Sequence, residues 1–223
     1  MNEFTIEDFE IDLKNPLGEG ELGTVYKATK KNSNEVYAIK KISIENLNEN
    51  ETQEIQEIQK IINMKVLNDC ENSIKYFGYF QDENFIYLIM ELCDYSLNNL
   101  LRSKSFNAKE IKEILEQLNN VFKIMHRFSI NHRNIKPENI LIKNLENNKC
   151  LYKFGLSKLI TQNYIAEPEK ATDGYTAPEI INDPYDNKLN VDLWNIGIFI
   201  HKLLFGTIPK INYIQDKKKN LFR

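Results

Sequence analysis

The sequence predicts an α+β protein of two lobes, a strand-rich lobe over residues 1–92 and a helical lobe over residues 93–223. Two observations predict this fold class: strand-like runs fill most of the first lobe, and two helices, over 108–128 and 191–205, dominate the second. A chain of 223 residues is long enough to bury a sizeable core. Because ligands often bind in clefts between such lobes, we expect a site near the boundary.

The first lobe is expected to be a sheet interrupted by one helix. Isoleucines at helical spacing predict that helix over about residues 52–66. Polar residues 81–84 between two apolar runs predict a hairpin. The expected strands are 9–17, 24–28, 35–42, 74–80 and 85–90.

The second lobe is expected to be organised by its two helices. The helix over 108–128 carries a continuous apolar stripe, and Asn107 with Glu110 three residues later has the pattern of a capping box. The helix over 191–205 is apolar on nearly all sides, which predicts that it is buried. Two short apolar runs lie between these helices, at 140–142 and 151–154. A long irregular stretch follows them and extends to about residue 179.

Composition and charge exclude several classes of protein. Lys and Arg total 29 against 32 Asp and Glu, and the resulting net charge of -3 argues against a nucleic-acid-binding protein. No run reaches the roughly 18 apolar residues of a membrane span, and the acidic N-terminus does not resemble a signal peptide. Three widely spaced cysteines, Cys70, Cys93 and Cys150, fit neither a disulfide framework nor a zinc site. We therefore expect a soluble cytoplasmic protein without a nucleic-acid or membrane partner.

A glycine-rich turn joins the first two expected strands and contains Gly18, Gly20 and Gly23, with Val25 two residues later. Glycine lets backbone amides approach phosphate oxygens because no side chain intervenes. A dinucleotide-binding fold uses a similar string but continues into a helix, whereas a strand follows here. A plain hairpin turn is the other interpretation of these residues taken alone.

Segments later in the chain resemble those of the protein kinase family, in the family's order. Ten consecutive residues, His132-Arg133-Asn134-Ile135-Lys136-Pro137-Glu138-Asn139-Ile140-Leu141, are similar to the catalytic loop. The other segments are Phe154-Gly155-Leu156, Gly174-Tyr175-Thr176-Ala177-Pro178-Glu179 and Val191-Asp192-Leu193-Trp194-Asn195-Ile196-Gly197. The resemblance covers about residues 9–209. A lysine two positions after the catalytic position, here Lys136, is similar to the pattern of serine/threonine kinases and not to that of tyrosine kinases.

The resemblance implies a kinase fold with ATP bound between its lobes. Lys40, on an expected strand, would bind the α- and β-phosphates and pair with a helix glutamate. Glu57 is our choice for that glutamate because Ile61, one turn later, would face the core. Glu54 is the alternative.

The same resemblance assigns the residues around the adenine ring. Met90 would be the gatekeeper at the back of the pocket, and the backbone of Glu91 and Cys93 would bind the adenine edge. Asp192 would hold the backbone of the catalytic loop, and Thr172 would line the side where a peptide binds. The residues on either side of the ring would be Val25, Ala38 and Leu141.

Two positions depart from active kinases. The family has an aspartate at position 134 that accepts or orients the proton of the substrate hydroxyl, and the amide of Asn134 is no useful base. A magnesium-binding aspartate should precede Phe154, but Lys153 stands there. In an alternative alignment three residues are deleted after Lys153, which then belongs to the preceding strand. In both alignments Asn139 is the only metal ligand left, so we expect weak or absent Mg²⁺ binding.

These features predict a pseudokinase that binds ATP or ADP and serves a protein partner as a regulatory or scaffolding module. Lys153 would supply the positive charge that magnesium supplies in active kinases. Two alternatives remain: a weak serine/threonine kinase in which Asn134 orients the hydroxyl, and a non-functional fragment. Because the chain stops soon after the 191–205 helix, we expect that helix to expose apolar surface and Glu179 to lack the arginine it pairs with in the family.

Overall fold

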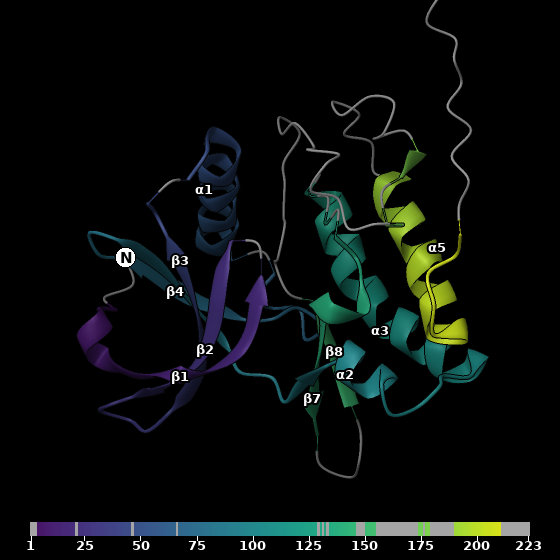
Figure 1. Ribbon diagram of the computed structural model, residues 1–223, viewed down its shortest axis with the longest axis horizontal. Helices are drawn as coiled ribbons and strands as arrows, with labels where there is room; N and C mark the ends of the chain where they lie inside the picture. The colour runs from purple at the N-terminus through teal and green to yellow at the C-terminus, as the bar shows by residue number, and fades with distance from the viewer. Residues whose placement is uncertain are drawn as a thin grey trace, which may run out of the picture.

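The computed structural model describes residues 4–20, 22–45, 47–65, 67–128, 130, 132, 134–145, 150–154, 174–175, 177–178 and 190–210. The side chains of residues 50, 54, 57, 61, 63, 64 and 190 lie outside this description. The described residues form two lobes that lie side by side, one built mainly of strands and the other mainly of helices (Figure 1).

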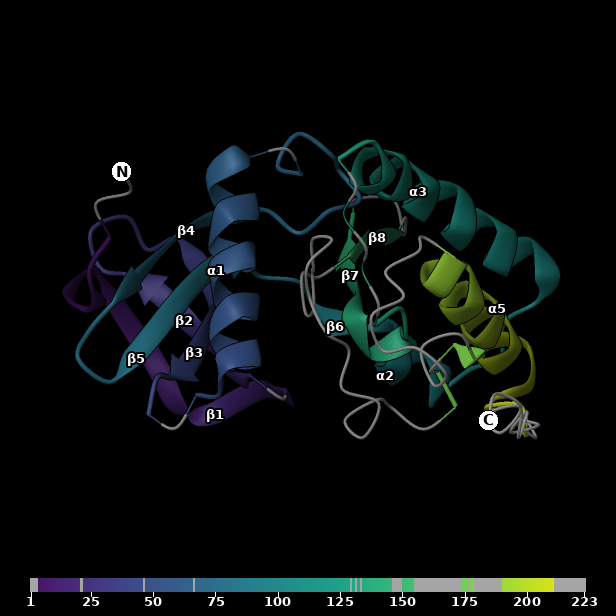
Figure 2. The same cartoon turned by 90° about the horizontal axis from the view of Figure 1, so that it is seen from above.

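An antiparallel sheet of five strands, in the order β1-β2-β3-β5-β4, forms the first lobe. Helix α1, Glu49–Met64, runs across one face of this sheet (Figure 2). Asn48 caps the helix, and three of the helix's own side chains, Ile55, Ile58 and Ile62, are buried. A 3-10 turn, η1 (Ile6–Asp8), precedes the strands, which are β1 (Phe9–Gly20), β2 (Gly23–Lys30), β3 (Val36–Ser43), β4 (Tyr76–Gln81) and β5 (Phe85–Glu91).

The two faces of the sheet are buried in different clusters. The face covered by α1 belongs to the main core through Ala38, Ile42 and Leu88. The opposite face carries an aromatic cluster, in which Phe80 stacks on Tyr87 with ring centroids 4.6 Å apart. Successive residues of a strand point to opposite faces, so each strand contributes to both clusters.

Helices α3, Ala108–Arg127, and α5, Asn190–Phe205, pack against each other in the second lobe (Figure 2). The predicted capping box is confirmed: Asn107 Oδ1 accepts the amide of Glu110 at 3.0 Å, and Glu110 Oε2 accepts the amide of Asn107 at 2.9 Å. A second sheet has the order β6-β7-β8. The remaining elements are β6 (Tyr95–Ser96), α2 (Leu97–Leu101), the 3-10 turn η2 (Pro137–Asn139), β7 (Ile140–Asn144) and β8 (Cys150–Phe154).

Helix α5 is buried on one face only, so the prediction of burial on nearly all sides is wrong. Val191, Phe199 and Leu203 are buried, whereas Leu193 is 65% and Phe205 67% exposed. An apolar groove of about 570 Å³ lies between α3 and α5. The exposed apolar surface that the sequence predicts on this helix is present.

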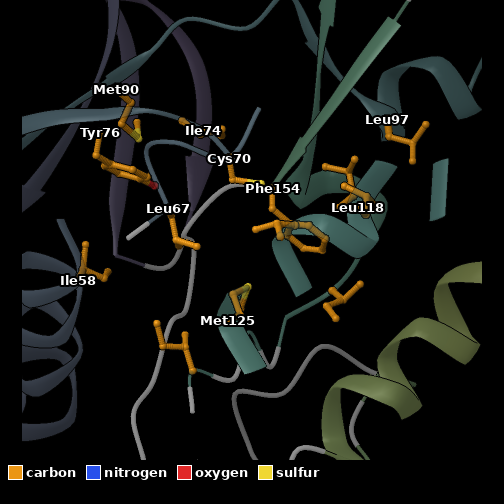
Figure 3. Close-up of a cluster of buried hydrophobic side chains, with 14 of the residues drawn as sticks. Ile58, Leu67, Cys70, Ile74, Tyr76, Met90, Leu97, Leu118, Met125 and Phe154 are labelled. Atoms are coloured by element: carbon orange, nitrogen blue, oxygen red, sulfur yellow. The ribbon is translucent and has the colours of Figure 1, made fainter. Parts of the chain in front are cut away.

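Main-chain hydrogen bonds join the lobes at a second place besides the segment between β5 and β6. The amide of Ile74 donates to the carbonyl of Phe154 at 3.0 Å, and the amide of Phe154 donates to the carbonyl of Asn72 at 2.8 Å. We call Asn72, Ile74 and Phe154 the interlobe junction. Figure 3 shows Ile74 of the first lobe and Phe154 and Leu118 of the second within one buried cluster.

Candidate active site

Strand register gathers the residues predicted around ATP on one face of the first sheet. Val25 of β2 lies opposite Lys40 of β3, and Ala38 of β3 lies opposite Met90 of β5. Residues paired across antiparallel strands share a face, as do Ala38 and Lys40, which are two residues apart. This face belongs to the main core, against which Val25 and, from the second lobe, Leu141 also pack.

The glycine-rich turn is the tip of the β1–β2 hairpin, where Gly18 pairs with Val25 and Gly20 with Gly23. Gly23 has a φ of +150°, and a Cβ there would lie 2.2 Å from the carbonyl oxygen of Lys41, so the fold itself requires glycine. A Cβ on Gly18 would meet nothing within 4 Å, and one on Gly20 would meet only the Gly23 oxygen, at 3.7 Å. The fold leaves Gly18 and Gly20 open to an approaching group, as a phosphate-binding turn requires.

Lys40 lies in the middle of β3 and is half-buried. The helix that covers this face of the sheet, α1, contains both glutamates proposed as its partner, Glu57 and Glu54. The side chains of these glutamates, and that of Ile61, lie outside the described residues. The pairing of Lys40 with Glu57 therefore stays a prediction.

The end of β5 holds the residues predicted at the adenine edge. Met90 is buried, and the amide of Glu91 donates to the carbonyl of Lys75 at 2.9 Å. Cys93 follows in the connection to β6 and is half-buried. Burial, and after it the Glu91 carboxylate, raises the pKa of the Cys93 thiol to about 11, so this thiol is protonated at neutral pH. Backbone contacts from Glu91 and Cys93 to adenine stay predictions.

Two lysines of the second lobe converge on the carboxylate of Glu91. Lys153 Nζ lies 3.0 Å from Glu91 Oε2, and Lys143 Nζ lies 2.7 Å from Glu91 Oε1. Lys153 Nζ also donates to the carbonyl of Ser73 at 3.3 Å. Burial raises the pKa of Glu91, but the hydrogen bonds from Lys143 and Lys153 outweigh burial and hold this pKa below its usual value. The carboxylate is therefore ionised at neutral pH.

The position of Lys153 in the fold can be compared with what each of the two alignments around Phe154 expects. Lys153 is part of β8, where it pairs with Leu141, and Phe154 ends the strand opposite Ile140. Lys153 thus belongs to the strand, as the alternative alignment has it. Its amine is directed to Glu91, and a place beside the phosphates stays a prediction.

Hydrogen bonds within residues 132–139, the predicted catalytic loop, bring together two of the residues predicted to be catalytic, Asn134 and Asn139. The amide of Asn134 donates to His132 Nδ1 at 3.3 Å, and Asn139 Nδ2 donates to the carbonyl of Asn134 at 2.7 Å. Lys136 directly precedes the η2 turn that contains Asn139. His132 is fully buried, and its ring centroid lies 4.5 Å from that of Phe154.

Helix α5 supports this loop at two points. Asp192 Oδ2 accepts a hydrogen bond from the amide of His132 at 2.8 Å, which confirms the prediction that Asp192 holds the backbone of the loop. Lys202 Nζ lies 2.9 Å from Glu138 Oε1. The sequence analysis missed this ion pair, because no local pattern joins residues that are 64 positions apart.

Replacing Asp192 with asparagine is expected to lower the melting temperature, Tm, by about 2–6 °C, because a neutral acceptor for the His132 amide is weaker than a charged one by about 1–1.5 kcal/mol. Differential scanning calorimetry measures this change. Leu193→Asn is the control, since Leu193 is 65% exposed and its substitution should shift Tm by less than about 2 °C. An unchanged Tm for Asp192→Asn would show that the hydrogen bond to His132 adds no stability.

Several residues singled out in the sequence lie outside the described residues, namely Arg133, Gly155, Leu156, Thr172 and Glu179. Within the described ranges, no helix combines the length and apolar character of a membrane span. The same part of the chain contains no cluster of three or more His, Cys, Asp or Glu side chains placed to hold a metal ion.

The elements and motifs described so far follow the order of one family. The family model named protein kinase domain matches residues 11–222 of the chain. The chain belongs to the protein kinase family. This kinase domain is 33% identical over 198 residues to Serine/threonine-protein kinase KIC1 of Saccharomyces cerevisiae, an alignment that covers 86% of this chain and 18% of KIC1.

Two other relatives are named as protein kinases. Calcium-dependent protein kinase 29 of Arabidopsis thaliana is 29% identical to this kinase domain over 203 residues, covering 89% of this chain and 37% of the relative. Serine/threonine-protein kinase pakH of Dictyostelium discoideum is 36% identical over 207 residues, covering 90% and 38%. The kinase domain thus spans between 18% and 38% of the length of these three relatives.

The fold is similar to that of a solved kinase structure. The crystal structure of Rad53 in complex with AMP-PNP superposes with a TM-score of 0.72 at 23% sequence identity, covering 94% of this chain and 52% of that chain. The two-lobed α+β fold predicted from the sequence is confirmed, and the relatives support the predicted serine/threonine type.

Proposed function

We propose that this kinase domain is a pseudokinase, which binds ATP or ADP between its lobes, transfers phosphate poorly and serves a protein partner as a regulatory or scaffolding module. The observation that carries the proposal is the catalytic loop, which is folded and supported but has Asn134 where catalysis requires a carboxylate. A cytoplasmic location remains part of the proposal.

Nucleotide binding is supported by the sheet face that holds Lys40. Apolar side chains flank this lysine, as an adenine pocket requires, and the lysine itself would bind the phosphates. Gly18 and Gly20 have room for a phosphate to approach the backbone of the hairpin. The similar Rad53 structure is a complex with AMP-PNP, and we extend nucleotide binding to this chain as a proposal.

We expect poor phosphoryl transfer because of the residues at the predicted base and metal positions. An amide cannot accept the proton of a substrate hydroxyl, and loss of a general base commonly lowers a rate by about 10²–10⁴-fold. Asn139, the one metal ligand that the family pattern retains, already donates its Nδ2 to the carbonyl of Asn134, and its side-chain oxygen alone would hold magnesium weakly. The two losses need not multiply, because such groups act as a unit.

Adding ATP at about 100 times its dissociation constant is expected to raise Tm by about 5–11 °C, because binding to the folded state stabilises it by about 2.7 kcal/mol. The shift should be equal with magnesium and with EDTA. Lys40→Ala should abolish it. Lys41→Ala is the matched control, since Lys41 is the next residue on the strand and its amine lies over the Phe85 ring, 3.7 Å from the centroid.

Each contrary result of this melt removes a different part of the proposal. A cooperative melt without any ATP shift would remove nucleotide binding and leave a protein-interaction module. A shift that requires magnesium would contradict the weak metal site. A shift that survives Lys40→Ala would place the nucleotide elsewhere.

The alternative function is a weak but active serine/threonine kinase, and the supports of the catalytic loop favour it. Asp192 still holds His132, and Asn139 still holds the backbone of Asn134. A largely dissociative transition state asks little of a base, so Asn134 could orient the hydroxyl. Transfer of labelled γ-phosphate to a protein mixture decides between the two. The pseudokinase proposal expects no transfer above that of Lys40→Ala, whereas an active kinase would show transfer that Lys40→Ala removes and Asn134→Asp increases.

A further inference from the structure

The amine of Lys153 lies where the two lobes meet. Lys153 belongs to β8 of the second lobe, yet within the described residues the hydrogen bond and the ion pair of its amine are both with the first lobe. Its Nζ donates to the carbonyl of Ser73, the residue before Ile74 of the interlobe junction, and it pairs with Glu91 at the end of β5. Glu91 is bonded in turn through its amide to the carbonyl of Lys75. One ammonium group therefore connects β8 to two separate segments of the first lobe.

The pair between Lys153 and Glu91 is buried, which determines how much it contributes. The side chain of Lys153 is 3% exposed and that of Glu91 is 10% exposed. A buried ammonium is costly without a counter-charge, and removal of one partner from a buried pair leaves the other charge uncompensated. Lys143 binds the other oxygen of the same carboxylate but is 42% exposed, and exposed ion pairs contribute little.

We propose that Lys153 is an internal counter-ion that fastens the end of β5 and the Ser73 segment to β8, and that it is not a ligand of phosphate. This proposal goes beyond the proposed function, since it requires no nucleotide. The charge expected beside the phosphates is instead used to neutralise Glu91. By fixing Glu91, Lys153 also fixes the start of the segment that leads through Cys93 into the second lobe.

Lysine labelling of the unmodified chain separates the two roles of Lys153. With limiting acetic anhydride and no ATP, peptide mass spectrometry should find Lys153 labelled at least about tenfold more slowly than Lys112, because a buried amine reacts only after local opening. The Lys112 side chain is 75% exposed. ATP should leave the labelling of Lys153 unchanged. Labelling of Lys153 as fast as Lys112 without ATP, with protection on adding ATP, would overturn the proposal in favour of a phosphate ligand.

Thermal melts without nucleotide test the same proposal energetically. Lys153→Met should lower Tm by about 6–20 °C, and Lys143→Met by less than about 4 °C. The double variant Glu91→Gln/Lys153→Met should regain about half of the loss or more, because it removes the buried carboxylate that Lys153→Met leaves with only the exposed Lys143 as its counter-charge. Equal losses for the two lysine variants, or a double variant no more stable than Lys153→Met, would contradict the proposal.

The double variant also decides the case in which Lys153→Met does not fold. A counter-ion role predicts that Glu91→Gln/Lys153→Met then still folds, and its failure to fold would exclude that role. A chain that does not bind ATP at all would refute the nucleotide part of the proposed function while leaving these melts and the labelling without ATP interpretable.

Discussion

Replacing Phe154 with alanine is expected to lower Tm by about 6–20 °C, which corresponds to a loss of about 3–5 kcal/mol in the free energy of unfolding. Phe154 is 1% exposed, and its ring centroid lies 5.0 Å from that of Phe122 and 4.5 Å from that of His132. Alanine would leave a cavity between these rings at the centre of the molecule. The variant should still fold, because the hydrogen bonds of the interlobe junction use the main chain of Phe154.

Circular dichroism melts of Phe154→Ala and Phe128→Ala measure this difference. Phe128 is the matched control, since it is a phenylalanine of the same lobe that is 41% exposed, and its loss should shift Tm by less than about 2 °C. Equal shifts for the two variants would mean that the Phe154 ring does not belong to the core.

Replacing Gly23 with alanine is expected to lower Tm by about 4–24 °C, since backbone strain and overpacking together cost about 2–6 kcal/mol. The new Cβ would lie 2.2 Å from the carbonyl oxygen of Lys41, and a φ of +150° is rare for any residue with a side chain. The carbonyl belongs to the central strand β3, so it cannot move aside without disturbing the sheet.

Gly18→Ala is the matched control for Gly23→Ala, because a Cβ on Gly18 would meet nothing within 4 Å. Its Tm without nucleotide should change by less than about 2 °C. If the hairpin holds phosphate as proposed, Gly18→Ala should nevertheless reduce the ATP-induced shift, because the new methyl group occupies the approach to the backbone. A Gly18→Ala protein that loses stability as much as Gly23→Ala would contradict the geometry of the hairpin.

Long periodic segments allowed most of the fold to be predicted. The helix expected over 108–128 and the hairpin around 81–84 agree with α3 and with β4–β5 to within two residues. The two residues of β6 and the five of α2 are too short to show a period, and tertiary contacts determine their conformation. The apolar composition of α5 indicated a buried helix but could not show which face stays exposed.

Local motifs explain which parts of the site could be predicted. The role of Asp192 depends on its place in a recognisable segment, and its hydrogen bond to His132 is as predicted. Lys153 was placed beside the phosphates from its neighbours in the chain alone. Its contact with Glu91 depends on the pairing of Lys153 with Leu141 and on how the two sheets pack, which the sequence does not show.

The hydrogen bonds of the interlobe junction use the amides of Ile74 and Phe154 and the carbonyls of Asn72 and Phe154. Every residue except proline supplies both groups, so these two main-chain hydrogen bonds do not depend on the side chains, and the Asn72 side chain adds one of its own, from Nδ2 to the carbonyl of Tyr152 at 3.0 Å. Substitutions along the two segments alter the packing around the junction without removing it. The two lobes can therefore stay joined here through main-chain groups when a side chain of the junction is changed.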